Sequence, residues 1–484
     1  MIERIKNKIS FDGLILLGVF AAGFLLRAYR LGEPSLFEDE LATAIRVDHP
    51  FFETISLLRH SSFPPIYYGV LNLWVSLFGN SEWSLRFPSV VFSAFTIIVI
   101  YKLGKELFNK QTGLLSAALL AFSPFAINHA QMAKMYGLFW FLGALTFLYF
   151  FRYIKDPSNK ALTCYILASL LSCYTMYAGH LLLISQGIMI LFMADREKWR
   201  QWFMGQGLII LACLPWVIYF LCSEKEMFHP QPSEVPYDYS GFLLKTFSWI
   251  SGAYCPQWGR WTSFIYFFLI MAFCTDAFLR KNGDRRSFYT KINYQGMVLW
   301  LLLPSCIYLI SNSLVLREAF AVRHIGFIQV PLILLVSSQI SCFQGLMNRA
   351  LAVLIVILAI NNSILYFQLD LRKPKQDWRR MAHDLSHLRQ KDDVVVSFTG
   401  PDMLKYYFKD DANGLHFVRN SEFSSNALMR NRILHPGTKS VFILYKDSSI
   451  QNVELEGFDF NYRASYGEIG FLHFQRRQTI GSHP

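Results

Sequence analysis

The sequence predicts a polytopic α-helical membrane protein with a small soluble α/β domain at its C-terminal end. Three observations lead to this fold class. Of the 484 residues, 53% are hydrophobic and only 17% are charged, whereas soluble domains average about 25% charged residues. The apolar residues gather in blocks of roughly 17–22, which is long enough to cross the hydrocarbon core of a bilayer as helices. After Asp370 the composition becomes charged, with short β-type runs.

About eleven apolar blocks are long enough to be transmembrane helices of a multi-pass protein in the inner or plasma membrane. We expect spans at approximately 11–29, 86–107, 112–129, 135–153, 161–177, 179–194, 203–222, 261–279, 294–312, 324–343 and 350–369. With the N-terminus in the cytoplasm, the loops on that side are all basic, as the positive-inside rule requires. The net charge of +12 is therefore explained by topology and does not indicate a nucleic-acid partner.

The segment 66–79 is also apolar, but at about 14 residues it is too short to cross comfortably. If it did cross, every later loop would change sides and the basic loops would face outward. We therefore expect a helix on the outer membrane surface, within an exported first loop at residues 30–85. This topology gives a transmembrane module at 1–369 and an exported α/β domain at 370–484. In that domain we expect a helix at 376–388 and strands at 394–398, 415–418, 440–445 and 471–474.

The eight cysteines predict neither a disulfide framework nor a metal centre. No CxxC pair occurs, and all of them except Cys255 lie in or at the ends of apolar blocks. We expect these residues to be small buried hydrophobic side chains. The eight are Cys164, Cys173, Cys213, Cys222, Cys255, Cys274, Cys306 and Cys342.

Three adjacent carboxylates, Glu38, Asp39 and Glu40, follow the first predicted span directly. Adjacent carboxylates repel one another at a membrane surface. One of them can serve as general base toward a hydroxyl, or the group can hold a divalent cation. A solvated acidic loop explains the same pattern, so both interpretations stay open at this point.

Three further exported segments carry polar groups close to the membrane. The first begins with His60, which could titrate near neutrality, and continues through Pro64 and Pro65 to Tyr67 and Tyr68. The Pro-Pro pair favours an extended approach to the surface helix. A proline turn with an exposed histidine is an equally good interpretation.

The other two segments are basic. Gln131 and Lys134 lie between predicted spans at a bilayer boundary, where uncompensated polarity is costly. Arg317, Arg323 and His324 lie between two later spans, and exported arginines run against the positive-inside trend. The two arginines and the histidine require an anionic partner, which is either a lipid headgroup phosphate or a phosphate-bearing substrate. Snorkelling to the membrane surface explains Lys134 alone, but not the whole polar cluster around it.

These features occur in an order that resembles membrane glycosyltransferases of the GT-C class. The similar group is family 39, or protein-mannosyltransferase-like, and it includes the lipid A aminoarabinose transferases. Asp39-Glu40 matches the family's acidic motif, and 63–68 resembles its His-Pro-Pro-Leu-Tyr-Tyr stretch. Residues 78–89 and 131–136 match further motifs, and Lys375-Gln-Asp377-Trp378-Arg379 resembles the start of the C-terminal domain in bacterial members. Two residues depart from the pattern: Phe63 replaces a histidine and Met132 replaces an acid.

The resemblance implies inverting transfer of a sugar, a hexose or a pentose, from a polyprenyl-phosphate donor to a hydroxyl acceptor on the exported face. In that interpretation Asp39 is the general base, and Glu40 positions Asp39 or the acceptor. Lys134, Arg317, Arg323 and His324 stabilise the departing phosphate. Substrate-binding residues would be Glu38, His60, Tyr67, Tyr68 and Gln131. The partners are a lipid-linked sugar donor, membrane lipids, and a glycan, lipid or protein acceptor.

Two other functions fit the same sequence. A transporter or flippase of lipid-linked glycans needs charged or broken helices near the bilayer midplane, and the sequence contains few. A catalytically inactive scaffold of the same fold follows if the substitutions at Phe63 and Met132 abolish activity. The sequence identifies no cofactor, and a divalent cation would be held by Asp39 and Glu40 if one binds.

Overall fold

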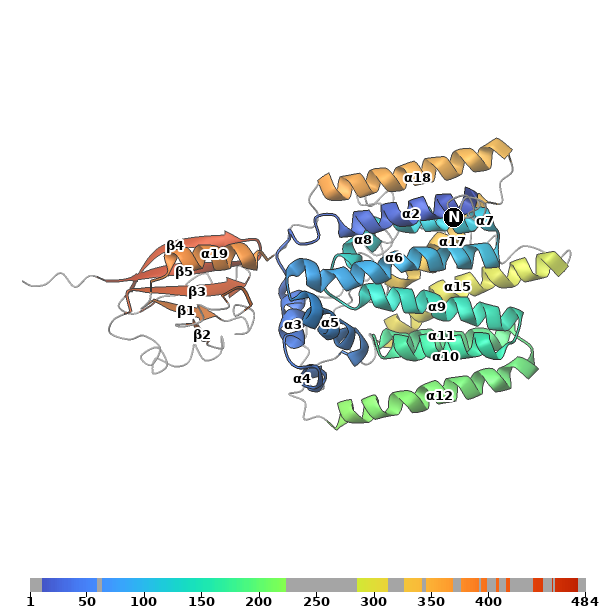
Figure 1. Ribbon diagram of the computed structural model, residues 1–484, viewed down its shortest axis with the longest axis horizontal. Helices are drawn as coiled ribbons and strands as arrows, with labels where there is room; N and C mark the ends of the chain where they lie inside the picture. Colours follow the sequence, from blue (N-terminus) through green and yellow to red (C-terminus); the bar gives the residue numbers. More distant parts are fainter. Residues whose placement is uncertain are drawn as a thin grey trace, which may run out of the picture. The chain divides into compact units, whose positions relative to one another are not determined.

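The long apolar segments fold as α-helices that lie side by side in the computed structural model (Figure 1). Residues 1–31, 51–74 and 86–371 form one compact unit, and residues 32–50, 75–85 and 372–484 form a second. The structure describes residues 11–58, 63–222, 285–311, 326–341, 345–368, 376–390, 393–397, 406–408, 415–417, 438–446, 455 and 458–477.

The first unit is helical in the part that the structure describes. Two of its helices, α5 and α6, have one end among the residues of the second unit. The elements are α2 Phe11–Ala28, α4 Phe51–Leu57, α5 Pro65–Phe78, α6 Glu82–Leu107, α7 Lys110–Ala121, α8 Pro124–Ala130, α9 Tyr136–Lys155, α10 Asn159–Cys173, α11 Ala178–Met193, α12 Arg196–Leu221, α15 Arg285–Ser311, η3 Gly326–Ile328, α17 Gln329–Ile340 and α18 Gly345–Gln368.

Each predicted span that falls within the described residues overlaps helical structure, although the span at 112–129 covers two helices, α7 and α8. The span at 261–279 lies outside the described residues. By length and apolarity alone, α2, α6, α9, α12 and the 349–368 part of α18 are long enough to cross a membrane, and the pair α7 and α8 forms a sixth, bent candidate. The helices at 65–78, 178–193 and 326–340 are apolar but shorter. The described residues therefore show several membrane-type helices, with α5 close to the predicted range of 66–79.

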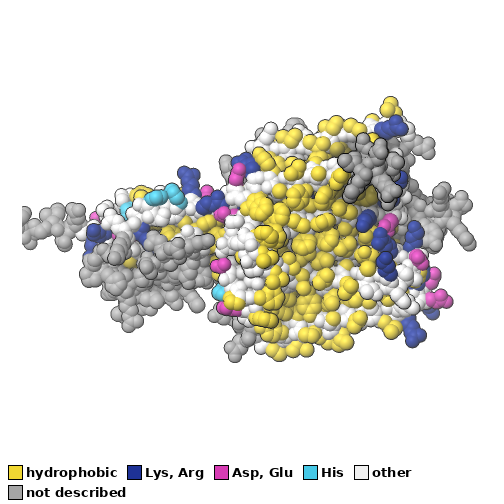
Figure 2. All heavy atoms as spheres, viewed as in Figure 1, with side chains coloured by type: hydrophobic (Ala, Val, Ile, Leu, Met, Phe, Trp, Pro, Cys, Tyr) yellow, Lys and Arg dark blue, Asp and Glu magenta, His cyan; other side chains and the backbone are white. Residues whose placement is uncertain are grey.

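Hydrophobic side chains cover most of the face of this helical unit that Figure 2 shows, while lysines and arginines on that face gather at helix ends. In the apolar windows of α2 and α18 only 11% of residues are buried. The surface of α2 includes Leu17 and Leu25, which are more than half exposed. An apolar lateral surface of this extent matches the hydrocarbon of a bilayer.

One predicted span, 112–129, is broken in the structure. The helices α7 and α8 are bent by 58° relative to each other. The first helix ends at Ala121, and Ser123 caps the second, because its hydroxyl accepts a hydrogen bond from the amide of Ala126 at 3.2 Å. Pro124 follows at the first helical position, where a missing N–H is tolerated. The sequence Ser123-Pro124 is therefore the local cause of the break.

The second unit contains a five-stranded mixed sheet in the order β2-β1-β3-β5-β4. Strand β1 pairs in parallel with β2 and with the central strand β3, and β5 pairs antiparallel with β3 and β4. The strands are β1 Val394–Ser397, β2 Leu415–Phe417, β3 Ser440–Lys446, β4 Phe458–Tyr466 and β5 Ile469–Arg476. The helix α19, Trp378–Leu388, buries Trp378, Met381 and Leu385 on one face at helical spacing.

The strand β4 is not among the predicted strands, and its burial explains why. It lies at an edge of the sheet, and its side chains are mostly exposed or half-buried. An edge strand of this kind carries many polar residues and therefore gives a weak apolar signal. Gly467, with a φ of 78°, forms the tight connection to β5 that a residue with a side chain would strain. The helix α3, Glu38–Val47, also belongs to the second unit.

Candidate functional site

The acidic segment of the first loop forms the first turn of helix α3. All three of its carboxylates, Glu38, Asp39 and Glu40, lie at the helix N-terminus, where the partial positive charge of the helix favours acids. Glu40 is 1% exposed, and its carboxylate accepts a hydrogen bond of 3.3 Å from the amide of Phe37. Glu40 therefore caps its own helix, while Glu38 and Asp39 are only half-buried.

The C-terminal part of the second unit holds this turn in place. The side-chain oxygen of Gln376 accepts a hydrogen bond of 3.1 Å from the amide of Glu38 and another of 3.2 Å from the indole of Trp378. Trp378 is 1% exposed, so its ring fixes Gln376 from the core of the unit. The segment that resembles the start of a bacterial C-terminal domain thus reaches back to the acidic residues.

Arg379 makes the largest set of contacts in this region. Its guanidinium pairs with the carboxylate of Glu82 through Nε at 2.8 Å and through Nη2. It also donates to the backbone oxygens of Gly32 and Glu33 at 3.0 and 3.1 Å, and its own amide donates to the hydroxyl of Ser35 at 3.1 Å. One arginine therefore joins α19 to the chain before α3 and to the start of α6.

Tyr407 completes this set of contacts. Its hydroxyl donates to Glu82 at 3.0 Å and accepts from the amide of Leu36 at 2.9 Å. Burial, and next the charge of Glu82, raise the pKa of the Tyr407 hydroxyl. The hydroxyl consequently keeps its proton and remains a donor to Glu82. Sequence reasoning did not single out Glu82, although the residue lies within the matched segment 78–89, and it gave no signal for Tyr407.

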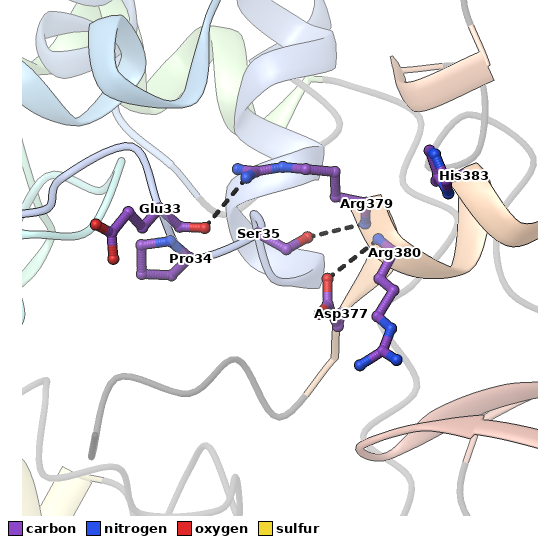
Figure 3. Close-up of a pocket in the computed structure, with 7 residues that line it drawn as sticks. All are labelled: Glu33, Pro34, Ser35, Asp377, Arg379, Arg380 and His383. Atoms are coloured by element: carbon purple, nitrogen blue, oxygen red, sulfur yellow. Dashed lines mark hydrogen bonds between the residues drawn. The ribbon is translucent and has the colours of Figure 1, made fainter. Parts of the chain in front are cut away.

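A pocket of about 280 Å³ lies beside Arg379 (Figure 3). Asp377 lines it and caps α19 by accepting from the amide of Arg380 at 3.2 Å. Asp39 and Glu40 are not among the lining residues of this pocket. Three of its lining residues, 33–35, come shortly before the acidic turn in the sequence, but the turn itself does not form the pocket. The lining residues are Glu33, Pro34, Ser35, Asp377, Arg379, Arg380 and His383.

In the first unit, Gln131 closes the C-terminal end of α2. Its side-chain amide donates to the carbonyl oxygens of Arg27 at 3.1 Å and Tyr29 at 3.0 Å. Arg27 is in the last turn of α2, where backbone carbonyls have no partner within the helix, and Tyr29 follows directly after that helix. In the structure Gln131, predicted as a substrate-binding residue, uses its side-chain amide for hydrogen bonds to the end of α2.

Lys134 is 3% exposed, and its ammonium lies 5.1 Å from the ring centroid of Phe63. Phe63 occupies the position where the similar family has a histidine, and its ring faces the cation in a cation–π contact. The same ring lies 5.8 Å from that of Tyr68. At the position where the similar family has a histidine, Phe63 therefore offers Lys134 the face of an aromatic ring.

Tyr67 and Tyr68 are both buried, at 1% and 0% exposure. The hydroxyl of Tyr67 lies 3.3 Å from that of Ser89, which donates to the carbonyl of Lys134 at 2.9 Å. This part of α5 therefore packs inward against the start of α6 and the segment around Lys134. His60, Arg317, Arg323 and His324, which the sequence singled out, lie outside the described residues.

Comparison with known proteins agrees with this architecture. Residues 62–219 match the family described as dolichyl-phosphate-mannose-protein mannosyltransferase. No curated protein matches the chain.

Solved structures with a similar fold cover nearly the whole chain. ArnT from Cupriavidus metallidurans bound to undecaprenyl phosphate superposes with a TM-score of 0.59 at 10% identity, over 96% of this chain and 98% of that one. Its apo form gives 0.53 at 11% identity, over 95% and 97%. The apo oligosaccharyltransferase of Archaeoglobus fulgidus gives 0.53 at 12%, over 91% and 70%.

At these identities the superpositions establish the fold alone. The predicted resemblance to the mannosyltransferase-like group of GT-C class glycosyltransferases is confirmed by the family match together with the shared fold. The chain is a multi-pass membrane protein with the fold of GT-C membrane glycosyltransferases and a small mixed sheet near its C-terminal end.

Proposed function

We propose that this protein is an integral-membrane glycosyltransferase that moves a sugar from a polyprenyl-phosphate donor to a hydroxyl acceptor on the exported face, with inversion. The observation that carries the proposal is the fixed acidic turn of α3, which Gln376 holds at the amide of Glu38. A general base must be held in one geometry to accept a proton in the transition state. The fold shared with an undecaprenyl-phosphate-bound transferase supports a polyprenyl carrier.

The burial of the three acids separates their roles. Glu40 is buried and caps its helix, which favours a positioning role. Asp39 is half-buried one residue earlier, so its carboxylate retains access to an acceptor hydroxyl. We therefore assign the base to Asp39. The proposed substrate-binding residues are Glu38, His60, Tyr67, Tyr68 and Gln131. Of these, the two tyrosines and Gln131 have buried side chains.

The departing phosphate requires cationic groups. Lys134 is one of the proposed cations, and its side chain is buried beside the ring of Phe63. Arg317, Arg323 and His324 are the remaining proposed donors, on the strength of the sequence alone. The proposed orientation keeps the N-terminus in the cytoplasm, with the acidic turn and the 370–484 region on the exported side.

The test compares Asp39→Asn with Asp48→Asn in cells that otherwise lack this gene. Both changes remove one carboxylate, at opposite ends of α3, and Asp48 is exposed. An asparagine at 48 keeps the oxygen that accepts from Asn80 at 3.0 Å. Mass spectrometry of envelope glycans, calibrated by the membrane level of each variant, reports the activity.

We expect Asp39→Asn to lose transfer by about 10²- to 10⁴-fold, the typical contribution of a general base. Asp48→Asn should transfer at the wild-type rate. Wild-type modification by Asp39→Asn at a normal membrane level would reject the assignment of the base. Unchanged envelope glycans on deletion of the whole gene would instead favour an inactive scaffold.

A further inference from the structure

Three residues that are far apart in the sequence lie together among helices α10, α11 and α12, which are neighbours in the first unit (Figure 1). They are Cys173 at the end of α10, His180 in the first turn of α11 and Cys213 in α12. Their ligand atoms, two thiol sulfurs and one ring nitrogen, all lie within 4.8 Å of one another. Both cysteines are buried, at 3% and 7% exposure, and His180 is half-buried.

The histidine is already oriented for a ligand. Its Nδ1 lies 3.1 Å from the carbonyl oxygen of Tyr177. A carbonyl only accepts, so Nδ1 carries the proton and the lone pair is left on Nε2. A hydrogen bond from the second ring nitrogen to a backbone carbonyl is the usual way in which proteins fix a metal-binding histidine.

The backbone around the cluster is built for close approach. A Cβ on Gly179 would lie 2.8 Å from the amide nitrogen of Cys173, so only glycine lets the start of α11 come this near to the end of α10. On the third helix, Pro215 interrupts the α12 hydrogen-bond ladder. The hydroxyl of Tyr174 donates to the carbonyl of Ala212 at 2.7 Å, which ties α12 beside Cys213 to the turn after α10.

We propose that Cys173, His180 and Cys213 form a binding site for a thiophilic metal cation of the zinc type. Two thiolates and one imidazole are a known zinc donor set, with Zn–S of about 2.3 Å and Zn–N of about 2.0 Å, and the fourth position goes to water or substrate. Ligand atoms of a tetrahedral ion then lie about 3.7 Å apart, within the observed limit of 4.8 Å. Each thiol releases its proton to solvent as it binds.

The cluster is connected to the start of α5. The carbonyl of Tyr174, next to Cys173, accepts a hydrogen bond of 3.0 Å from the amide of Ile66, which directly follows the Pro-Pro pair. A bound ion would cross-link α10, α11 and α12 at the turn that holds this amide. The site is distinct from the acidic turn of α3, and the proposal does not depend on the sugar-transfer activity.

The test uses the full-length protein in detergent, purified through a tag without histidine and stripped with a chelator. It is then equilibrated with Zn²⁺ or with Co²⁺ as a spectroscopic probe. We expect about one zinc ion per chain and a thiolate-to-cobalt charge-transfer absorption. Cys173→Ser combined with Cys213→Ser, and His180→Asn alone, should lower the zinc content at least several-fold. Cys222→Ser is the matched control, because Cys222 is an exposed cysteine at the end of the same α12.

A second measurement needs no variant. Zn²⁺ should protect Cys173 and Cys213 of the wild-type protein from maleimide, as read by peptide mass spectrometry, while Cys222 reacts with or without the metal. Because both cysteines are buried, the labelling is carried out at a temperature at which the chelator-stripped protein reacts at these two positions. Equal labelling of Cys173 and Cys213 with and without Zn²⁺ then overturns the proposal. It is also overturned if unreduced membranes yield a Cys173–Cys213 disulfide, or if the double variant binds as much zinc as Cys222→Ser.

Discussion

The side-chain oxygen of Gln376 accepts a hydrogen bond of 3.1 Å from the backbone amide of Glu38, a residue 338 positions earlier in the chain. That amide is in the first turn of α3, where helix N–H groups have no partner within the helix. The segment after the last apolar helix therefore completes the cap of the helix that carries Asp39.

Replacement of Gln376 by alanine should weaken this cap. The amide of Glu38 loses its protein partner, which costs about 1 kcal/mol of unfolding free energy. If Asp39 is the general base, transfer should fall together with stability, because the first turn of α3 is less fixed. Thermal unfolding in detergent and glycan analysis measure the two effects. Gln390→Ala, at an exposed position just after α19, is the control, and equal behaviour of the two variants would contradict the prediction.

Arg379→Ala should destabilise the second unit more strongly than Arg380→Ala. The substitution removes the pair with Glu82 and two hydrogen bonds to the carbonyls of Gly32 and Glu33. Because Glu82 is mostly buried, we expect a loss of about 2–3 kcal/mol. The exposed Arg380 provides a comparison at the adjacent position. A melting curve of Arg379→Ala that overlays that of Arg380→Ala would show that these contacts contribute nothing.

Arg27→Leu should destabilise the first unit. The Arg27 side chain is fully buried and donates to the carbonyls of Leu120 and Ala121 at 2.9 and 3.0 Å, where α7 ends before the bend. These carbonyls lose their helical partners at the break, and each unpaired buried group costs about 1–3 kcal/mol. Detergent-solubilised protein is the sample for calorimetry. Arg200→Leu is the control, because it removes an exposed arginine from α12. That variant should melt near the wild-type temperature, and a similar melting point for the two variants would refute this account.

Tyr466→Phe should change how stability depends on pH. The hydroxyl of Tyr466 donates to Asp384 at 2.7 Å, and this bond is the main cause that lowers the pKa of that carboxyl, with smaller contributions from His383 and Arg380. A carboxyl with a lowered pKa stabilises the folded state above its ordinary value of about 3.9, and the stabilisation disappears as pH falls through the folded-state pKa.

Unfolding temperatures measured from about pH 7 to about pH 3 test this sign. The advantage of the wild-type protein over Tyr466→Phe should be constant above about pH 5 and should shrink below about pH 4. Tyr462→Phe is a suitable control, because the Asp384 carboxyl accepts its hydrogen bond from Tyr466 and not from Tyr462. A wild-type advantage that stays the same at every pH would argue against ionisation of Asp384 as its source.

The helical part of the fold follows from local sequence. Apolar runs such as 135–153 and 203–222 became α9 and α12, because a chain with apolar side chains that enters lipid must satisfy its polar backbone groups by internal hydrogen bonding. The helix at Trp378–Leu388 and four of the five strands, β1, β2, β3 and β5, were also placed from local sequence. The break at Ser123 and Pro124 was missed, although both residues are known helix-start signals. The edge strand β4 was missed because its exposed faces are polar.

The candidate site was only partly accessible from the sequence. The acidic residues 38–40 and the segment around Trp378 were recognised as features of interest. Their partnership was not, nor was the role of Glu82 as the common partner of Arg379 and Tyr407. A hydrogen bond between residues hundreds of positions apart leaves no periodic signal in either segment.

The sequence by itself determined that the chain enters a membrane as several helices and carries a polar domain after them, because hydropathy and charge act locally along the chain. The tertiary structure decided which polar groups meet. It placed Gln376 at the start of α3, the carbonyls of the α7–α8 break around Arg27, and Cys173 beside Cys213. Buried polar groups must find partners, and the fold, not the neighbouring residues, determines which partners are within reach.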